Sequence, residues 1–237
     1  MTIQAVTFDF WNTLVHATTD RSEVRVRAWQ ALLADAGPAI DASEIRAVFD
    51  IVWERHQAAW TRNEQYDGRR AATEAADLLG IPDAASTLRA HLAAAFVADA
   101  DDAFSPCPGV VDVIGRLSAA GVRLGIICDV GFTPSTALRD LLDRFGVLGA
   151  FAGWSFSDEV GWYKPSPVIF DHARSYLGAD ATEIAHIGDL RRTDVAGARS
   201  QGWTSVRYRG VHDDVTDGPE GDHVVDDYAT LLDTLGL

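Results

Sequence analysis

The chain of 237 residues is long enough for an α/β domain together with an inserted domain. Its 47% apolar and 23% charged residues exclude a disordered chain and allow a substantial buried core. The net charge of −15 argues against nucleic acids and anionic membranes as partners, and the sequence lacks an apolar run of the ~18 residues that a membrane span needs. Two cysteines, and an N-terminus without basic residues before its apolar run, predict a reducing, cytoplasmic location.

The first half of the chain predicts one strand followed by a long helical region. Residues 3–8 are β-rich and end at Asp9. From about residue 20 to about residue 100, the chain is rich in Ala, Arg and Glu and has the pattern of helices. Because the first strand must join the strands that come later, we interpret residues 16–100 as an inserted α-helical domain.

After Pro106, short β-branched runs alternate with amphipathic helices. The predicted strands are 122–128, 151–156, 184–187, 204–208 and 223–225, and the predicted helices are 134–145, a helix that opens at Ser166, 193–201 and 228–235. This alternation predicts an α/β fold, with a Rossmann-like parallel sheet covered by helices on both faces. The predicted core domain comprises residues 1–15 and 101–237.

Three predicted strands are followed directly by carboxylates. Asp9 follows the first strand, Asp129 follows residues 122–128, and Asp189 follows residues 184–187. In parallel sheets, ligands bind at the carboxyl ends of the strands, so these side chains should share one crevice. Close carboxylates require a cation or a raised pKa, and oxygen ligands of this kind suit Mg²⁺.

The 20 basic residues include a single lysine, Lys164, in a loop just before a predicted helix. Mutational bias alone could leave one lysine among arginines. However, the compact ammonium of lysine is not interchangeable with a planar guanidinium where a point charge is needed. The position of Lys164 near the carboxylates therefore favours a functional role.

Four short motifs, in order and on the predicted elements, resemble those of the haloacid dehalogenase superfamily. They are Phe8-Asp9-Phe10-Trp11-Asn12-Thr13-Leu14, residues 124–129, Lys164-Pro165, and Gly188-Asp189 followed by Asp194. The resemblance extends across nearly the whole chain, and residues 16–100 match the helical cap of that family. It implies a hydrolase with a small-molecule substrate.

The resemblance also implies a role for each matched residue. Asp9 would be the nucleophile that forms a covalent aspartyl intermediate. Asp9, Asp189 and the backbone carbonyl of Trp11 would hold Mg²⁺, and Asp194 would orient Lys164 or the water shell of the metal. Lys164 would neutralise the nucleophile and the transferred group.

The second motif departs from the family pattern, because Cys128 replaces the usual hydroxyl residue and is a weak hydrogen-bond donor. Thr133, Ser135 or the backbone N–H of Asp129 could replace that contact with the substrate. Arg55 in the helical region could match the arginine with which dehalogenases of the superfamily hold a halide or carboxylate.

The first motif departs as well, because Trp11 stands where family phosphatases carry a second aspartate that acts as acid and base. Three hypotheses stay open. The chain could be a Mg²⁺-dependent phosphatase of a small phosphorylated metabolite with atypical acid–base chemistry. It could be a metal-independent 2-haloacid dehalogenase, a branch with an aromatic residue at this position, although that branch lacks an aspartate like Asp189. It could also be a non-catalytic binding protein on the same scaffold.

Overall fold

The structure is a computed structural model that describes residues 3–36, 40–98 and 103–237. The chain forms two compact units. The sheet unit comprises residues 1–16, 105–129 and 139–237, and the helical unit comprises residues 17–104 and 130–138. The boundary that the sequence predicts between residues 100 and 101 lies outside the described residues. Residues 130–138, which are predicted to belong to the core domain, group with the helical unit instead.

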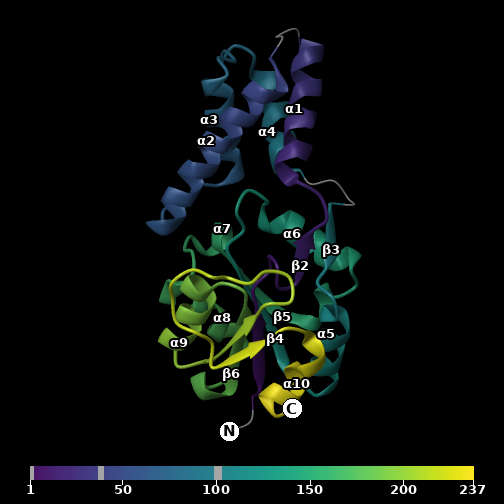
Figure 1. The fold of residues 1–237 in the computed structure, drawn as a ribbon, viewed down its shortest axis with the longest axis vertical. Coiled ribbons are helices and arrows are strands. Elements are labelled where there is room, and N and C mark those ends of the chain that lie inside the picture. Colours follow the sequence, from purple (N-terminus) through teal and green to yellow (C-terminus); the bar gives the residue numbers. More distant parts are fainter. Residues whose placement is uncertain (1–2, 37–39, 99–102) are drawn as a thin grey trace. The chain divides into compact units, whose positions relative to one another are not determined.

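The sheet unit is built on a six-stranded sheet in which every pairing is parallel (Figure 1). The strand order is β5-β4-β1-β6-β7-β8. The strands are β1 (Ala5–Phe8), β4 (Arg123–Cys128), β5 (Phe151–Phe156), β6 (Ile184–Gly188), β7 (Thr204–Tyr208) and β8 (His223–Val225). The predicted α/β fold with a parallel sheet is therefore confirmed.

Helices cover both faces of this sheet. They include α5 (Val110–Ala119), α7 (Ser157–Val160), α8 (Pro167–Leu177), α9 (Ala196–Ser200) and α10 (Leu231–Leu235). Helix α6 (Ser135–Arg144) begins in the helical unit and ends in the sheet unit. On one face, Ala5 and Ile127 pack against Phe170 of α8. On the other face, the ring of Phe8 lies 6.3 Å from the ring of Tyr228, just before α10. Successive side chains of a strand point to opposite faces, so continuous apolar runs are what a sheet covered on both sides requires.

Short turns complete the sheet unit, and two of them interrupt predicted helices. They are η1 (Leu148–Ala150), η2 (Ala181–Glu183), η3 (Arg191–Val195) and η4 (Tyr228–Thr230). The helix expected at 193–201 begins instead with the π-helical turn η3, in which Val195 N donates to Leu190 O, before continuing as α9. The helix expected at 228–235 begins with η4.

The helical unit contains α1 (Arg21–Ala36), α2 (Ala42–Thr61), α3 (Gly68–Leu78) and α4 (Ser86–Val97). Its core is aromatic: the fully buried Trp29 packs edge-on against Phe49, with ring centroids 5.0 Å apart. Phe132 lies 5.1 Å from Phe96 and 5.0 Å from His56, between ring centroids. Burial of this one aromatic ring explains why residues 130–138 belong to the helical unit.

The connections between the two units contain β2 (Val15–Ala17) and β3 (Phe104–Pro106), which pair as a separate two-stranded sheet. Within the described ranges, every helix is too short or too polar to cross a membrane.

Candidate active site

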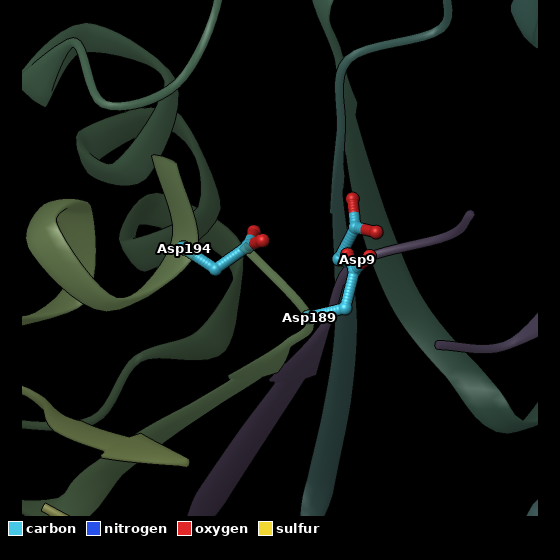
Figure 2. Close-up of side chains that lie close together, drawn as sticks. All are labelled: Asp9, Asp189 and Asp194. Atoms are coloured by element: carbon cyan, nitrogen blue, oxygen red, sulfur yellow. The ribbon is translucent and has the colours of Figure 1, made fainter. Parts of the chain in front are cut away.

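Asp9 and Asp189 follow the carboxyl ends of the neighbouring strands β1 and β6. The register pairs Phe8 with Ile187, and the backbone N–H of Asp9 donates to the carbonyl of Ile187 at 2.8 Å. Both carboxyl side chains are buried. Together with Asp194 they form a cluster in which one oxygen of each lies within 4.8 Å of the others (Figure 2). The parallel pairing of the strands thus delivers these carboxylates to one place.

The turn after β6 brings Asp194 into the cluster. Its Oδ2 accepts a hydrogen bond from the backbone N–H of Leu190 at 3.0 Å, which closes the π-helical turn back onto the strand end. A Cβ at Gly188 would lie 2.2 Å from Cγ of Asp194, so only glycine lets the carboxyl approach so closely. π-helical turns of this kind are frequent at functional sites.

Lys164 lies between two of the three carboxylates. Its Nζ donates to Asp9 Oδ1 at 2.5 Å, to Asp194 Oδ1 at 2.6 Å and to the carbonyl of Ile127 at 3.0 Å. An ammonium has three N–H donors, and these contacts use all of them. The side chain is 2% exposed, so its charge acts in a medium of low polarity.

Asp129 fixes the backbone that carries this lysine. Its Oδ1 accepts a hydrogen bond from the backbone N–H of Lys164 at 2.9 Å. The carboxylate that follows β4 therefore ties the lysine loop to the strand end.

The cluster contains three carboxyl groups and one ammonium. Burial raises the pKa of Asp9 well above its usual range, reinforced by Asp194 and Asp189 and opposed by Lys164. Burial and the charge of Asp194 raise the pKa of Asp189 to about 7. Burial also opposes ionisation of Asp194 and of Lys164. Even so, their mutual attraction lowers the pKa of Asp194, with help from His186, and raises that of Lys164.

Three carboxylates and one ammonium leave a buried excess of negative charge, and a divalent cation would offset it. Oxygen-only donors suit Mg²⁺ better than softer metals. The residues present therefore fit a hard divalent cation.

His186 and Thr7 support the cluster from within the sheet, and neither residue belongs to the four sequence motifs. His186 Nε2 lies 3.1 Å from Asp194 Oδ1, and its Nδ1 lies 2.8 Å from the Thr7 hydroxyl. Burial lowers the pKa of His186 and keeps the ring neutral. A neutral ring that donates from Nε2 to Asp194 has Nδ1 as the acceptor that faces the Thr7 hydroxyl. Both are polar residues at paired positions in otherwise apolar strands, which is a signal that the sequence does contain.

Asn12 and His212 also contact Asp189 and were not selected from the sequence. Asn12 Nδ2 lies 3.4 Å and His212 Nδ1 lies 2.7 Å from Asp189 Oδ2. Asn12 belongs to the first motif and adopts the left-handed backbone conformation, with φ of 56°. His212 lies 23 residues beyond Asp189, and no spacing in the sequence connects the two.

Comparison with known proteins supports the resemblance read from the motifs. The haloacid dehalogenase-like hydrolase family matches residues 3–202. The chain belongs to this family. As a haloacid dehalogenase-like hydrolase, it is an enzyme, and the predicted family membership is confirmed.

Relatives of this hydrolase include phosphatases. Glyceraldehyde 3-phosphate phosphatase of Methanopyrus kandleri is 30% identical over 235 residues, which are 95% of this chain and 92% of that protein. Phosphoglycolate phosphatase of Rhodospirillum rubrum is 28% identical over 240 residues, which are 99% of this chain and 91% of that protein. The structure of 2-haloacid dehalogenase from Pseudomonas syringae pv. Tomato DC3000 shares the fold, with a TM-score of 0.71, 21% identity and 99% of both chains covered.

Cys128 and Trp11, which are also predicted site residues, both pack against other parts of this hydrolase. Cys128 is fully buried at the end of β4, where burial raises the pKa of its thiol well above the usual range. The ring of Trp11 packs edge-on against Phe10, with centroids 4.9 Å apart.

Thr133 and Arg55 belong to the helical unit. Thr133 Oγ1 accepts a hydrogen bond from Arg21, and Arg55 forms an ion pair with Glu74 at 2.9 Å.

Proposed function

We propose that this hydrolase is a Mg²⁺-dependent phosphatase that acts on a small phosphorylated metabolite through an aspartyl intermediate at Asp9. The observation that carries the proposal is the buried cluster of Asp9, Asp189 and Asp194 around one lysine. The two relatives that align over almost their full length are both named as phosphatases of small phosphorylated compounds, which supports the same reaction.

The metal ion would be held by Asp9, Asp189, Asp194 and the backbone carbonyl of Trp11. When bound, it would supply positive charge to the phosphoryl oxygens and offset the charge of the carboxylates.

The protein's own groups would perform the transfer. A carboxylate oxygen of Asp9 attacks phosphorus, and the bond between phosphorus and the leaving-group oxygen breaks. Lys164 offsets negative charge on Asp9 and on the transferred group, and its hydrogen bond to Asp194 holds the ammonium in place. Cys128, the backbone N–H of Asp129 and the hydroxyl of Thr133 are the proposed contacts for the phosphoryl group. Water then attacks phosphorus, the bond between phosphorus and Asp9 breaks, and inorganic phosphate leaves with the Asp9 carboxylate restored.

A second candidate function is metal-independent 2-haloacid dehalogenation. Trp11 favours it, because this side chain cannot exchange protons as the aspartate of phosphatases does. In that reaction the Asp9 carboxylate would displace halide from carbon, and Arg55 would hold the halide or the substrate carboxylate. The acidic cluster favours the phosphatase, because displacement of halide needs one carboxylate and gains nothing from the buried Asp189.

A turnover screen separates the two functions. The purified protein is incubated with glyceraldehyde 3-phosphate, 2-phosphoglycolate, acetyl phosphate and 2-chloropropionate, each with Mg²⁺ and with a chelator. We expect phosphate release only with Mg²⁺, and none from Asp9→Asn, whose far-UV circular dichroism should match the wild type. Halide release in the chelator would establish the dehalogenase, and full activity of Asp9→Asn would exclude a covalent intermediate at that residue.

A further inference from the structure

The loop between β7 and β8, residues 209–222, places one histidine on the acidic cluster. His212 Nδ1 lies 2.7 Å from Asp189 Oδ2. The imidazole is 45% exposed, whereas the carboxyl of Asp189 is 3% exposed. His212 therefore contacts the buried cluster from the side of the solvent.

The residue after His212 is anchored to the sheet. Asp213 accepts a hydrogen bond from Arg207 Nη1 at 2.6 Å, and the guanidinium of Arg207 is 2% exposed. Arg207 also binds Glu220, near the end of the loop, through Nε at 2.6 Å and Nη2 at 3.0 Å. A buried, bidentate arginine thus ties both ends of the loop to β7.

The next residue, Asp214, ties the loop to the segment that carries Asp189. It is 3% exposed, and its Oδ2 accepts a hydrogen bond from the backbone N–H of Arg191 at 2.7 Å. Arg191 lies two residues after Asp189 in the chain. The side chain of Asp214 therefore binds the backbone next to Asp189, so the contact between His212 and Asp189 does not depend on an unanchored surface loop.

This contact engages one oxygen of Asp189 and leaves the other for a cation. Asn12 approaches the same oxygen, Oδ2, at 3.4 Å. A ligating carboxylate whose second oxygen is held by a neighbour keeps a fixed orientation, and loss of such a neighbour weakens metal binding.

We propose that His212 is a positioning residue of the metal centre: its imidazole holds Asp189 Oδ2 and thereby sets the affinity of the cluster for a divalent cation. The proposal rests on the metal-dependent function above. It adds a residue from outside the matched motifs, in a loop that lies beyond the family match at residues 3–202.

Isothermal titration calorimetry with Mg²⁺ and with Ni²⁺ tests the proposal. It compares the wild type with His212→Ala, His212→Asn and the control His223→Ala, which removes an exposed histidine of β8. We expect His212→Ala to bind Mg²⁺ about 10- to 100-fold more weakly. The Nδ2 of asparagine can occupy the place of Nδ1, so His212→Asn should stay within a few-fold of the wild type, as should His223→Ala. Thermal unfolding in a chelator shows that the variants remain folded.

The outcomes are distinct. Unchanged Mg²⁺ affinity in His212→Ala, with the wild type binding normally, overturns the positioning role alone. A much larger loss for Ni²⁺ than for Mg²⁺ would make the imidazole a direct nitrogen ligand, which also overturns it. A wild type that binds neither cation overturns the proposed metal-dependent function together with this inference.

Discussion

The surroundings of Lys164 explain why this position holds the chain's single lysine. Its three acceptors, on Asp9, Asp194 and Ile127, surround one nitrogen atom. An ammonium presents its donors around a point, whereas a guanidinium presents them in a plane and needs more room. Arginine, although abundant elsewhere in the sequence, cannot reproduce this arrangement.

We therefore expect Lys164→Arg to lower kcat by about 10²-fold or more, since the positive charge is kept but displaced. Lys164→Met, which leaves the carboxylates without a buried cation, should also destabilise the fold by about 3–5 kcal/mol. Steady-state kinetics and urea unfolding measure the two effects. Normal turnover by Lys164→Arg would show that charge alone is sufficient.

Trp11 determines which leaving groups the proposed phosphatase can release. Because an indole cannot protonate the departing oxygen, rates should depend steeply on leaving-group pKa, with acyl and aryl phosphates faster than alkyl phosphates. Trp11→Asp should raise alkyl phosphate turnover by up to ~10²-fold, and Trp11→Asn, which has no transferable proton, should not. A leaving-group series at fixed Mg²⁺ measures this. Wild-type rates that do not change with leaving-group pKa would mean that another residue supplies the proton.

At the scale of elements, the cluster depends on how tightly the turn after β6 folds. The close approach of Asp194 to Gly188 is possible only without a Cβ on the latter. Strand β6 also contributes His186, which bonds both Asp194 and Thr7 of β1. One strand and the turn after it thus hold the carboxylate that positions Lys164.

Gly188→Ala should push Asp194 away from Lys164. We expect at least a tenfold loss of kcat and a destabilisation of about 1–3 kcal/mol, because the added methyl group has no space. Gly149→Ala is the matched control, since a Cβ there meets nothing within 4 Å. Kinetics and chemical denaturation of both variants are the measurements, and equal behaviour of the two would contradict this account of the turn.

At the scale of the whole molecule, the site adds a pH dependence to stability. The pKa of Asp189 is about 7 in the folded protein, against a usual 3.8. Between these values the folded state keeps a proton that the unfolded state releases. Protonated Asp189 therefore contributes fully to the free energy of unfolding below about pH 4, and this contribution is lost as the pH rises through about 7.

Urea unfolding of the metal-free protein between about pH 5 and pH 8 tests this. The wild type should lose stability relative to Asp189→Asn as the pH rises, by at most about 1.4 kcal/mol per pH unit. Saturating Mg²⁺, which binds the ionised carboxylate, should reduce this loss of stability with rising pH. A difference between the two proteins that does not change with pH would show that Asp189 is ionised throughout.

The strands of the parallel sheet and the residues at their carboxyl ends could be predicted from the sequence. Local runs of apolar and β-branched residues predict the strands, and parallel pairing places the carboxyl ends of the strands along one edge of the sheet. Asp9 and Asp189 could therefore be predicted to lie together, and Lys164 stood out by composition. The residue at which α9 begins could not be predicted from the sequence. The π-helical turn η3 precedes α9, and this turn forms around the side chain of Asp194, which accepts a hydrogen bond from the backbone of Leu190.

The residues that surround those carboxylates could not be predicted from the sequence, because long-range packing brings them there. His212 meets Asp189 because Arg207 and the backbone of Arg191 bind the loop that carries it, and His186 meets Asp194 because of the turn after β6. Residues 130–138 join the helical unit because Phe132 packs among its aromatic rings. Such contacts arise from the packing of segments far apart in the chain, and the local periodicity of the sequence does not predict them.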